Sequence, residues 1–380
     1  MKSLAWQEVV TTMSFRREMV ILANRTNANI REIGRRYKVS PKTIYKWLKR
    51  YAKDGEEGLR DISRRPHQSP KRCSKNVEAK VLKIRDAHPA WGARKIGVRL
   101  KTIGEIAVPV DSTIHEILRR HERIDPEESA KHTAWQRFEH AAPNQLWQMD
   151  FKGWFTVGNG VQCHPLTIVD DHSRYAVCLE GCTNQRTETV QGHLTEKFRR
   201  YGLPERMTMD NGSPWGGDAE HRYTPLTVWL IRLGIGVSHS RPYHPQTQGK
   251  DERFHRTLKA EVLRGRNFRD MAQAQESFDK WRPIYNHERP HEAIGMAVPA
   301  SRYQISWRRF PEAVPAIEYG SAGEVRRVQD KGHVSYKGKC IVVGKAFRGY
   351  PIAFRPTTQE GILDVYFCQH RIMQIDMKNY

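Results

Sequence analysis

Three acidic residues in the middle of the chain have the surroundings of a reactive centre. Asp150 lies inside a hydrophobic run, where an uncompensated carboxylate is costly. Asp210 ends a second such run and is followed by an Asn-Gly turn signal, and Glu252 lies near the start of a long helical pattern. Carboxylate oxygens are the ligands that Mg²⁺ and Mn²⁺ prefer, and paired ions suit in-line phosphoryl transfer. Spacing alone is a weak indication, because the chain has 42 acidic residues.

The elements around these acids predict a mixed α/β domain. Runs of β-type residues alternate with segments of helical periodicity. We expect strands at 146–155, 166–171, 174–180, 205–210 and 235–238, and helices at 187–201, 224–233 and 248–264.

The motifs around the acids also resemble a known family. The strings QLWQMDFKG, TMDNGSPWG and YHPQTQGKDERFHRTLKAEVL are similar to the integrase catalytic core of retroviral integrases and bacterial insertion-sequence transposases. RPIYNHERPHEAIGMAVPASRY resembles the tail of that core, so the resemblance covers about residues 143–303. Helix-turn-helix units ahead of the core, without a His-His-Cys-Cys zinc module, favour a bacterial transposase.

The resemblance implies an RNase H-like domain at 143–305 with an Asp-Asp-Glu site. Asp150, Asp210 and Glu252 match the three positions, as catalytic residues and as metal ligands. Two Mg²⁺ ions per site are implied, with Mn²⁺ as a substitute. The 41 residues between Asp210 and Glu252 exceed the common family spacing, which predicts an insertion around 216–224.

Other acids near the motifs are expected to be structural. Asp170 and Asp171 would shape the turn that follows their strand. Asp251 would point about 100° away from Glu252 on the helix.

The implied reaction is DNA transposition. Water and then a DNA 3′-hydroxyl would attack a phosphate, so that the element's 3′ ends are first cut and then joined to target DNA. No phosphate-cradling G-x-x-x-x-G-K-[ST] loop is present, so no nucleotide cofactor is expected. Two alternatives stay open: a DNA-binding regulator with a non-catalytic core, and a metal-dependent nuclease that cuts without joining.

Residues 1–65 predict a helix-turn-helix DNA-binding domain. Between 29 and 51 two apolar stripes of helical spacing are separated by a turn, and Ser40 followed by Pro41 is a strong helix start. Residues 31–75 hold 15 Lys/Arg and 5 Asp/Glu. An ordinary solvated helical pair is the alternative. The candidate DNA contacts on the second helix are Ser40, Lys42, Thr43, Tyr45, Lys46, Lys49 and Arg50.

Two further regions flank the α/β domain. Residues 66–142 predict a second helical or helix-turn-helix domain and a connector, with helices at 77–88, from 93, and at 109–120; a purely structural bundle is the alternative. Residues 317–380 alternate short β runs with Gly turns and predict a small β-barrel. Its role, in binding DNA or a neighbouring subunit, stays open.

The helix that carries Glu252 offers a second set of candidate DNA contacts. Arg256 and Lys259 lie four and seven residues further on, so they share its face, although a solvated face is the alternative. The full set is His244, Gln248, Lys250, Arg256 and Lys259.

Charge and composition agree with a DNA partner. Lys plus Arg is 64 and Asp plus Glu is 42, which gives a net charge of +22. This charge favours a polyanionic partner, with nucleic acid the leading candidate, and the resemblance implies that the partner is double-stranded DNA. We expect a homo-oligomer on DNA. No apolar run reaches membrane-spanning length, and the first residues lack the apolar core of a signal peptide. These features favour a cytoplasmic, nucleoid-associated bacterial protein.

Overall fold

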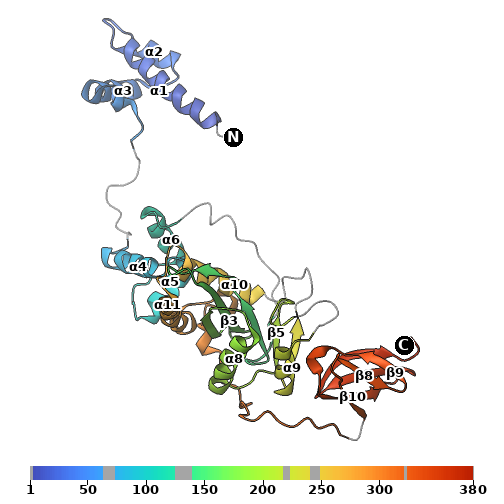
Figure 1. Cartoon of the computed structure of the whole chain (residues 1–380). Coiled ribbons are helices and arrows are strands. Elements are labelled where there is room, and N and C mark those ends of the chain that lie inside the picture. Colours follow the sequence, from blue (N-terminus) through green and yellow to red (C-terminus); the bar gives the residue numbers. More distant parts are fainter. Residues whose placement is uncertain are drawn as a thin grey trace. The chain divides into compact units, whose positions relative to one another are not determined.

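The computed structural model describes residues 3–62, 73–124, 139–216, 223–239, 249–320 and 323–379, with side chains from residue 13 on. The chain divides into two units, Met1–Arg72 and Cys73–Tyr380 (Figure 1). Each unit is described by itself below. None of the helices in the described ranges is long and apolar enough to cross a membrane.

The first unit is a small helical domain. It contains α1 (Ser3–Ala23), α2 (Ile30–Arg36), α3 (Pro41–Asp54) and the short 3₁₀ helix η1 (Gly55–Leu59). The predicted start of α3 is confirmed, because the Ser40 hydroxyl accepts a hydrogen bond from the Thr43 amide at 3.3 Å. Ile44 and Trp47 are buried on the inner side of α3, so the predicted apolar stripe forms the core of the helix-turn-helix.

The second unit begins with a bundle of three helices, α4 (Lys75–Ala87), α5 (Ala93–Thr102) and α6 (Asp111–Arg120). Their core contains Trp91, Ile96 and Ile114, all of which are completely buried. Arg99 of α5 forms an ion pair with Glu288, which lies beyond the central sheet in sequence. The bundle is therefore tied to the α/β domain by a specific contact.

The predicted mixed α/β domain is confirmed. Its six-stranded sheet has the order β2-β3-β1-β5-β6, with β4 paired to β3. β3 runs antiparallel to β1, β2 and β4, whereas β5 is parallel to β1 and β6. The strands are β1 (Leu146–Phe151), β2 (Phe155–Thr156), β3 (Gln162–Asp170), β4 (Ala176–Cys182), β5 (Arg206–Met209) and β6 (Gly236–His239).

Helices cover both faces of this sheet. On one face, Trp147 and Met149 of β1 belong to the same core cluster as Phe198 of α8. On the other, Val169 of β3 packs in a cluster with Phe254 of α10. The helices are α8 (Thr187–Tyr201), α9 (Pro225–Arg232), α10 (Gly249–Leu258) and α11 (Met271–Pro283), with short turns η3 (Lys259–Leu263), η4 (Ile284–Glu288), η5 (Glu292–Ile294) and η6 (Pro299–Ser301).

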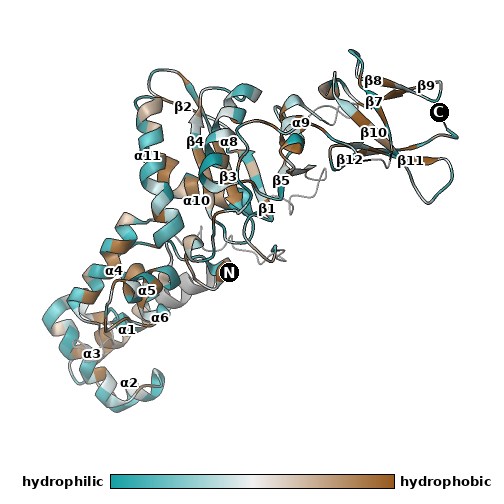
Figure 2. Ribbon diagram, turned by 90° about the horizontal axis from the view of Figure 1, so that it is seen from below, coloured by the Kyte–Doolittle hydropathy of each residue, from teal (hydrophilic) through white to brown (hydrophobic). Residues whose placement is uncertain are grey.

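The described residues of the C-terminal region form six short strands, but the predicted closed barrel is not confirmed. One open sheet has the order β12-β11-β10-β7, and β8 and β9 form a separate hairpin. Buried hydrophobic stretches mark β10 and β11 (Figure 2). The elements are β7 (Glu324–Arg327), β8 (His333–Tyr336), β9 (Lys339–Val342), η7 (Lys345–Phe347), β10 (Pro351–Pro356), β11 (Ile362–Phe367) and β12 (His370–Asp376).

Candidate active site

Strand β1 directs Asp150 toward helix α10. Side chains alternate along a strand, so Trp147 and Met149 lie on the α8 face while Gln148 and Asp150 lie on the other. The antiparallel register places Asp150 opposite Thr167 of β3. The hydrophobic residues on either side of Asp150 thus anchor the strand, and its carboxylate lies on the face that α10 covers.

Asp210 follows the end of β5, the parallel neighbour of β1. The register pairs Gln148 with Thr208. Continuing this register by two residues brings Asp210 beside Asp150. The parallel β1–β5 pairing therefore places these two acids at neighbouring strand ends.

The carboxylate of Asp210 is held in place by its own turn. It accepts hydrogen bonds from the Gly212 amide, at 2.8 Å, and from the indole N–H of Trp215. Trp215 is buried and stacks on Phe151 of β1, with ring centroids 5.2 Å apart. The turn after β5 is thereby fixed against the strand that carries Asp150.

The two carboxylates repel each other. Burial, and then the negative charge of Asp210, raise the pKa of Asp150 to about 7. The Phe151 amide, which donates to the Asp150 carboxylate at 2.8 Å, opposes the shift but does not cancel it. Two partly buried carboxylates that repel each other are suitable ligands for a divalent cation. A cation between them would offset the cost of desolvation and the repulsion between the two negative charges.

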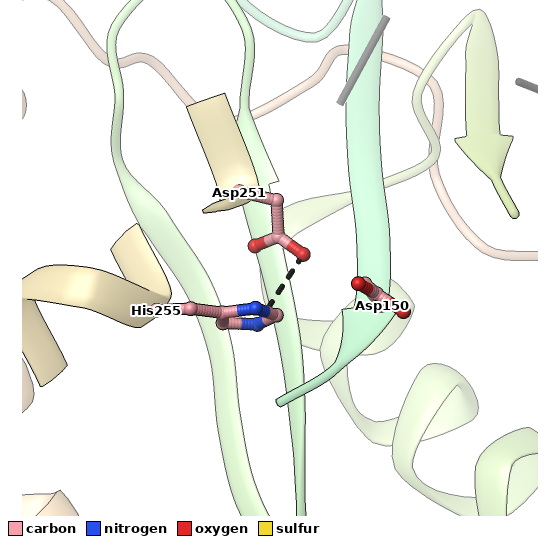
Figure 3. A group of neighbouring side chains, drawn as sticks. All are labelled: Asp150, Asp251 and His255. Carbon is pink, nitrogen blue, oxygen red and sulfur yellow. Dashed lines mark ion pairs between the residues drawn. The ribbon is translucent and has the colours of Figure 1, made fainter. Parts of the chain in front are cut away.

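Helix α10 adds two buried polar groups to this edge of the sheet. Asp150, Asp251 and His255 each offer one ligand atom within 4.8 Å of the others (Figure 3). The His255 Nε2 atom lies 3.5 Å from an Asp251 carboxylate oxygen. Burial and the charge of Asp150 raise the pKa of Asp251 well above its usual value, and burial lowers the pKa of His255 to about 3. Burial therefore disfavours the charged form of both side chains.

Glu252 leaves α10 about 100° around the helix axis from Asp251 and is exposed. The structure brings Asp251, rather than Glu252, against Asp150. The predicted divergence of Asp251 from Glu252 agrees with this arrangement, but the closeness of Asp251 to Asp150 was not predicted. His255 was missed as well, although its spacing of four residues from Asp251 on the buried face was a usable signal.

The other acids at the sheet are structural. Asp170 accepts hydrogen bonds from the Ser173 amide at 2.8 Å, the Ser173 hydroxyl at 2.5 Å and the Asn144 amide at 2.7 Å. Its predicted role in the turn is confirmed. Asp171 accepts hydrogen bonds from Gln148 and from the His140 amide, each at 2.9 Å.

The predicted DNA contacts near the site have different surroundings. Lys250 forms an ion pair with the buried carboxylate of Asp171, so its ammonium is engaged within the protein. Arg256 of α10 and Lys259, the first residue of η3, are exposed. His244 and Gln248 lie outside the described residues.

On α3 the predicted DNA contacts form an exposed, basic face. Lys42, Tyr45, Lys46 and Lys49 are exposed, and Ser40 and Thr43 take part in the helix cap. Lys46 and Arg50 lie over the Trp47 ring, with their charged groups 5.0 and 4.7 Å from its centroid. Two basic side chains of this face therefore pack on Trp47. Contacts of the face with DNA stay a prediction.

Comparisons with known proteins match most of the chain. Integrase core domain models match residues 140–245 and 233–299. A helix-turn-helix domain model matches residues 15–67, and a homeodomain-like domain model matches residues 43–118. The chain thus combines helix-turn-helix domains with an integrase core, and it resembles the bacterial insertion-sequence transposases.

The C-terminal region makes the resemblance more specific. Residues 323–380 match the model of the IS481 family transposase C-terminal domain. An uncharacterized 31.7 kDa protein of insertion element IS407 from Burkholderia multivorans is 27% identical over 177 residues, which are 47% of this chain and 61% of that protein. An uncharacterized 39.2 kDa protein of insertion element IS476 from Xanthomonas euvesicatoria is 25% identical over 243 residues, 63% of this chain and 67% of that protein.

Among solved structures, the HTLV-2 integrase catalytic core domain in complex with magnesium is similar to part of the chain. The match has 12% sequence identity and a TM-score of 0.32, and it covers 43% of this chain and 99% of that one.

Proposed function

We propose that this protein is a DNA transposase. It binds the terminal inverted repeats of its own mobile element, cleaves at the 3′ ends and joins them to target DNA by metal-dependent transesterification. The observation that carries the proposal is the repulsive pair of Asp150 and Asp210 at neighbouring strand ends, inside the segment that matches an integrase core.

Asp150, Asp210 and Glu252 are the proposed metal ligands and catalytic residues, for Mg²⁺ or Mn²⁺ and with two ions per site. When bound, such ions stabilise charge on the phosphate and lower the pKa of the attacking hydroxyl. The protein's own contribution is orientation. The Gly212 amide and the Trp215 indole fix the carboxylate of Asp210, and the buried neighbours of Asp150 fix β1.

DNA recognition is assigned to the amino-terminal unit, with the exposed side of α3 in the major groove. Lysine and arginine side chains on this unit displace counterions from the phosphates, so affinity falls steeply with salt. Joining two ends to one target needs at least two active sites, which supports a homo-oligomer on DNA. The same assignment supports a cytoplasmic, nucleoid-associated location.

The experiment incubates the full-length protein with the DNA that flanks its own gene, in Mg²⁺ or Mn²⁺, and maps nicks on both strands. A transposase gives nicks at the 3′ ends of the element, followed by joined products. Nicks without joined products indicate the nuclease, and end binding without nicks indicates the regulator. Asp150→Asn is the control, which binds the ends and leaves them uncut.

A further inference from the structure

A buried polar cluster lies beneath α10, next to the proposed metal ligands. The Thr167 hydroxyl oxygen lies 2.9 Å from the main-chain oxygen of Asp150 and 3.1 Å from each carboxylate oxygen of Asp251. It also lies 2.7 Å from Nε2 of His255. One hydroxyl thus connects strand β1, strand β3 and two successive turns of α10.

The residues of this cluster are buried. Thr167 and Asp251 are completely buried, and His255 is 9% exposed. The Asp251 amide lies 3.3 Å from the side-chain oxygen of Gln148, which makes a second connection between α10 and β1. Polar groups in such a position are stable only when they are paired, so α10 can lie on the sheet only in the rotation that pairs them.

Hydrophobic packing alone fixes this rotation less strictly. Phe254 and Leu258 also pack against the sheet, and apolar contacts tolerate small rotations because they have no preferred direction. Hydrogen bonds lose strength steeply when donor and acceptor are misaligned. Because Asp251 and Glu252 are consecutive, holding Asp251 inward also sets the direction in which Glu252 leaves the helix.

We propose that Thr167, Asp251 and His255 are positioning residues, which fix the rotation of α10 and the end of β1 so that Glu252 and Asp150 are presented to the metal ions. The inference rests on the proposed function, because Glu252 is a ligand only in that account. It assigns a role to Asp251 that differs from metal binding, although Asp251 is the acid that lies against Asp150.

The test compares two substitutions at one buried hydroxyl. Thr167→Val removes the hydroxyl and keeps the shape of the side chain, whereas Thr167→Ser keeps the hydroxyl. Thr257→Val is the matched control: Thr257 lies on α10, is 9% exposed, and its hydroxyl lies 3.0 Å from the Arg253 carbonyl oxygen and 3.5 Å from a guanidinium nitrogen of Arg289. Each variant is measured for joining of precut ends, for melting temperature without metal, and for the rise in melting temperature caused by Mn²⁺.

Thr167→Val is expected to lose about 100-fold in joining rate, at a temperature where it is fully folded, and to show a smaller rise with Mn²⁺. Thr167→Ser and Thr257→Val are expected to join at nearly the wild-type rate. Wild-type joining by Thr167→Val, or an equal loss in Thr257→Val, would overturn the proposal.

Asp251→Asn separates positioning from metal binding. The amide oxygen of asparagine accepts the Thr167 hydrogen bond, so this variant is expected to keep most of its joining activity and its rise with Mn²⁺. Loss of both, to the level of Asp150→Asn, would make Asp251 a metal ligand and overturn the positioning role.

If the wild-type protein joins no DNA, the proposed function fails, and the Mn²⁺ measurements still decide this inference. Absence of any rise in the wild-type protein overturns both.

Discussion

Two groups of aspartates lie at opposite ends of β1, and their surroundings differ. At one end, Asp170 and Asp171 are completely buried, and each accepts several hydrogen bonds. At the other end, the carboxylate of Asp150 accepts one hydrogen bond from the Phe151 amide within the described residues and experiences the negative charge of Asp210. The first group is satisfied by hydrogen bonds, whereas in the second the Asp150 carboxylate faces the negative charge of Asp210, whose own carboxylate is held by Gly212 and Trp215.

This difference separates structural acids from reactive ones better than burial does. Asp170 is more buried than Asp150, and burial raises its pKa, but hydrogen bonds from Ser173 and Asn144 oppose that shift. The Asp150 carboxylate has a second acid, Asp210, as its neighbour, whereas the neighbours of the Asp170 carboxylate are hydrogen-bond donors. Repulsion from a neighbouring acid is typical of reactive sites, although it also acts on Asp251, to which we assign a positioning role.

The largest expected effect is on cleavage. Asp150→Asn, Asp210→Asn and Glu252→Gln should each lower cleavage of element ends by on the order of 10³-fold or more, because charge stabilisation in the transition state is lost. End binding, measured in parallel by titration, should persist. Asp279→Asn, an exposed acid on α11, is the control and should cleave normally. A variant of the three that cleaves at the wild-type rate is not a ligand.

The second effect concerns stability. Asp171→Ala removes the acceptor for Gln148, for the His140 amide and for the ammonium of Lys250. The free energy of unfolding should fall by about 3 kcal/mol, as for other buried pairs that lose one partner. Asp150→Asn should not destabilise the protein, because it removes a repulsion. Urea denaturation measures both, and equal losses would contradict the distinction between the two groups.

The third effect is on the pH dependence of stability. The pKa of Asp150 is raised from 3.8 to about 7, so the folded protein binds more protons than the unfolded chain between these values. Stability from this group is therefore lost as pH rises from about 4 to 7. Asp150→Asn should flatten the decrease, and so should Mn²⁺ in the wild-type protein. Melting temperatures are measured across this pH range without metal, for the wild-type protein and for Asp150→Asn. An equal decrease in the two proteins would refute the assignment of the pH dependence to Asp150.

The smallest effect concerns two exposed basic residues, Arg256 of α10 and Lys259 of η3. Arg256→Ala and Lys259→Ala should each slow joining of precut ends by about tenfold, the equivalent of one charge-assisted hydrogen bond of about 1.4 kcal/mol. Overall DNA affinity should change less, because the amino-terminal unit supplies most of it. Lys280→Ala on α11 is the control. Unchanged joining in the double variant would leave both residues on a solvated face.

Much of this arrangement follows from local sequence. Ser40 followed by Pro41 predicts the start of α3, and the hydrophobic run around Asp150 predicts a strand. These features depend on neighbours in sequence, which a pattern captures. The predicted strand at 146–155 was too long, because β1 ends at Phe151 and the chain pairs again only at β2.

The remaining features depend on contacts between distant residues. Thr167 meets Asp251 across 84 positions, and Lys250 meets Asp171 across 79. Neither pairing has a local signal, so the sequence predicts neither the buried hydrogen bond of Thr167 nor the ion pair of Lys250. Closure of the C-terminal barrel likewise depends on which strands pair, and the observed order leaves both sheets open.

The most direct test of the central claim is a joining assay with precut element ends and a supercoiled target plasmid, in Mg²⁺. Precut ends remove the cleavage step, so the assay measures transesterification at the Asp150–Asp210 site alone. The wild-type protein should give ends covalently joined to the plasmid, and Asp150→Asn should bind the same ends without joining them. Joined products from Asp150→Asn at the wild-type rate, or none from the wild-type protein, would contradict the account.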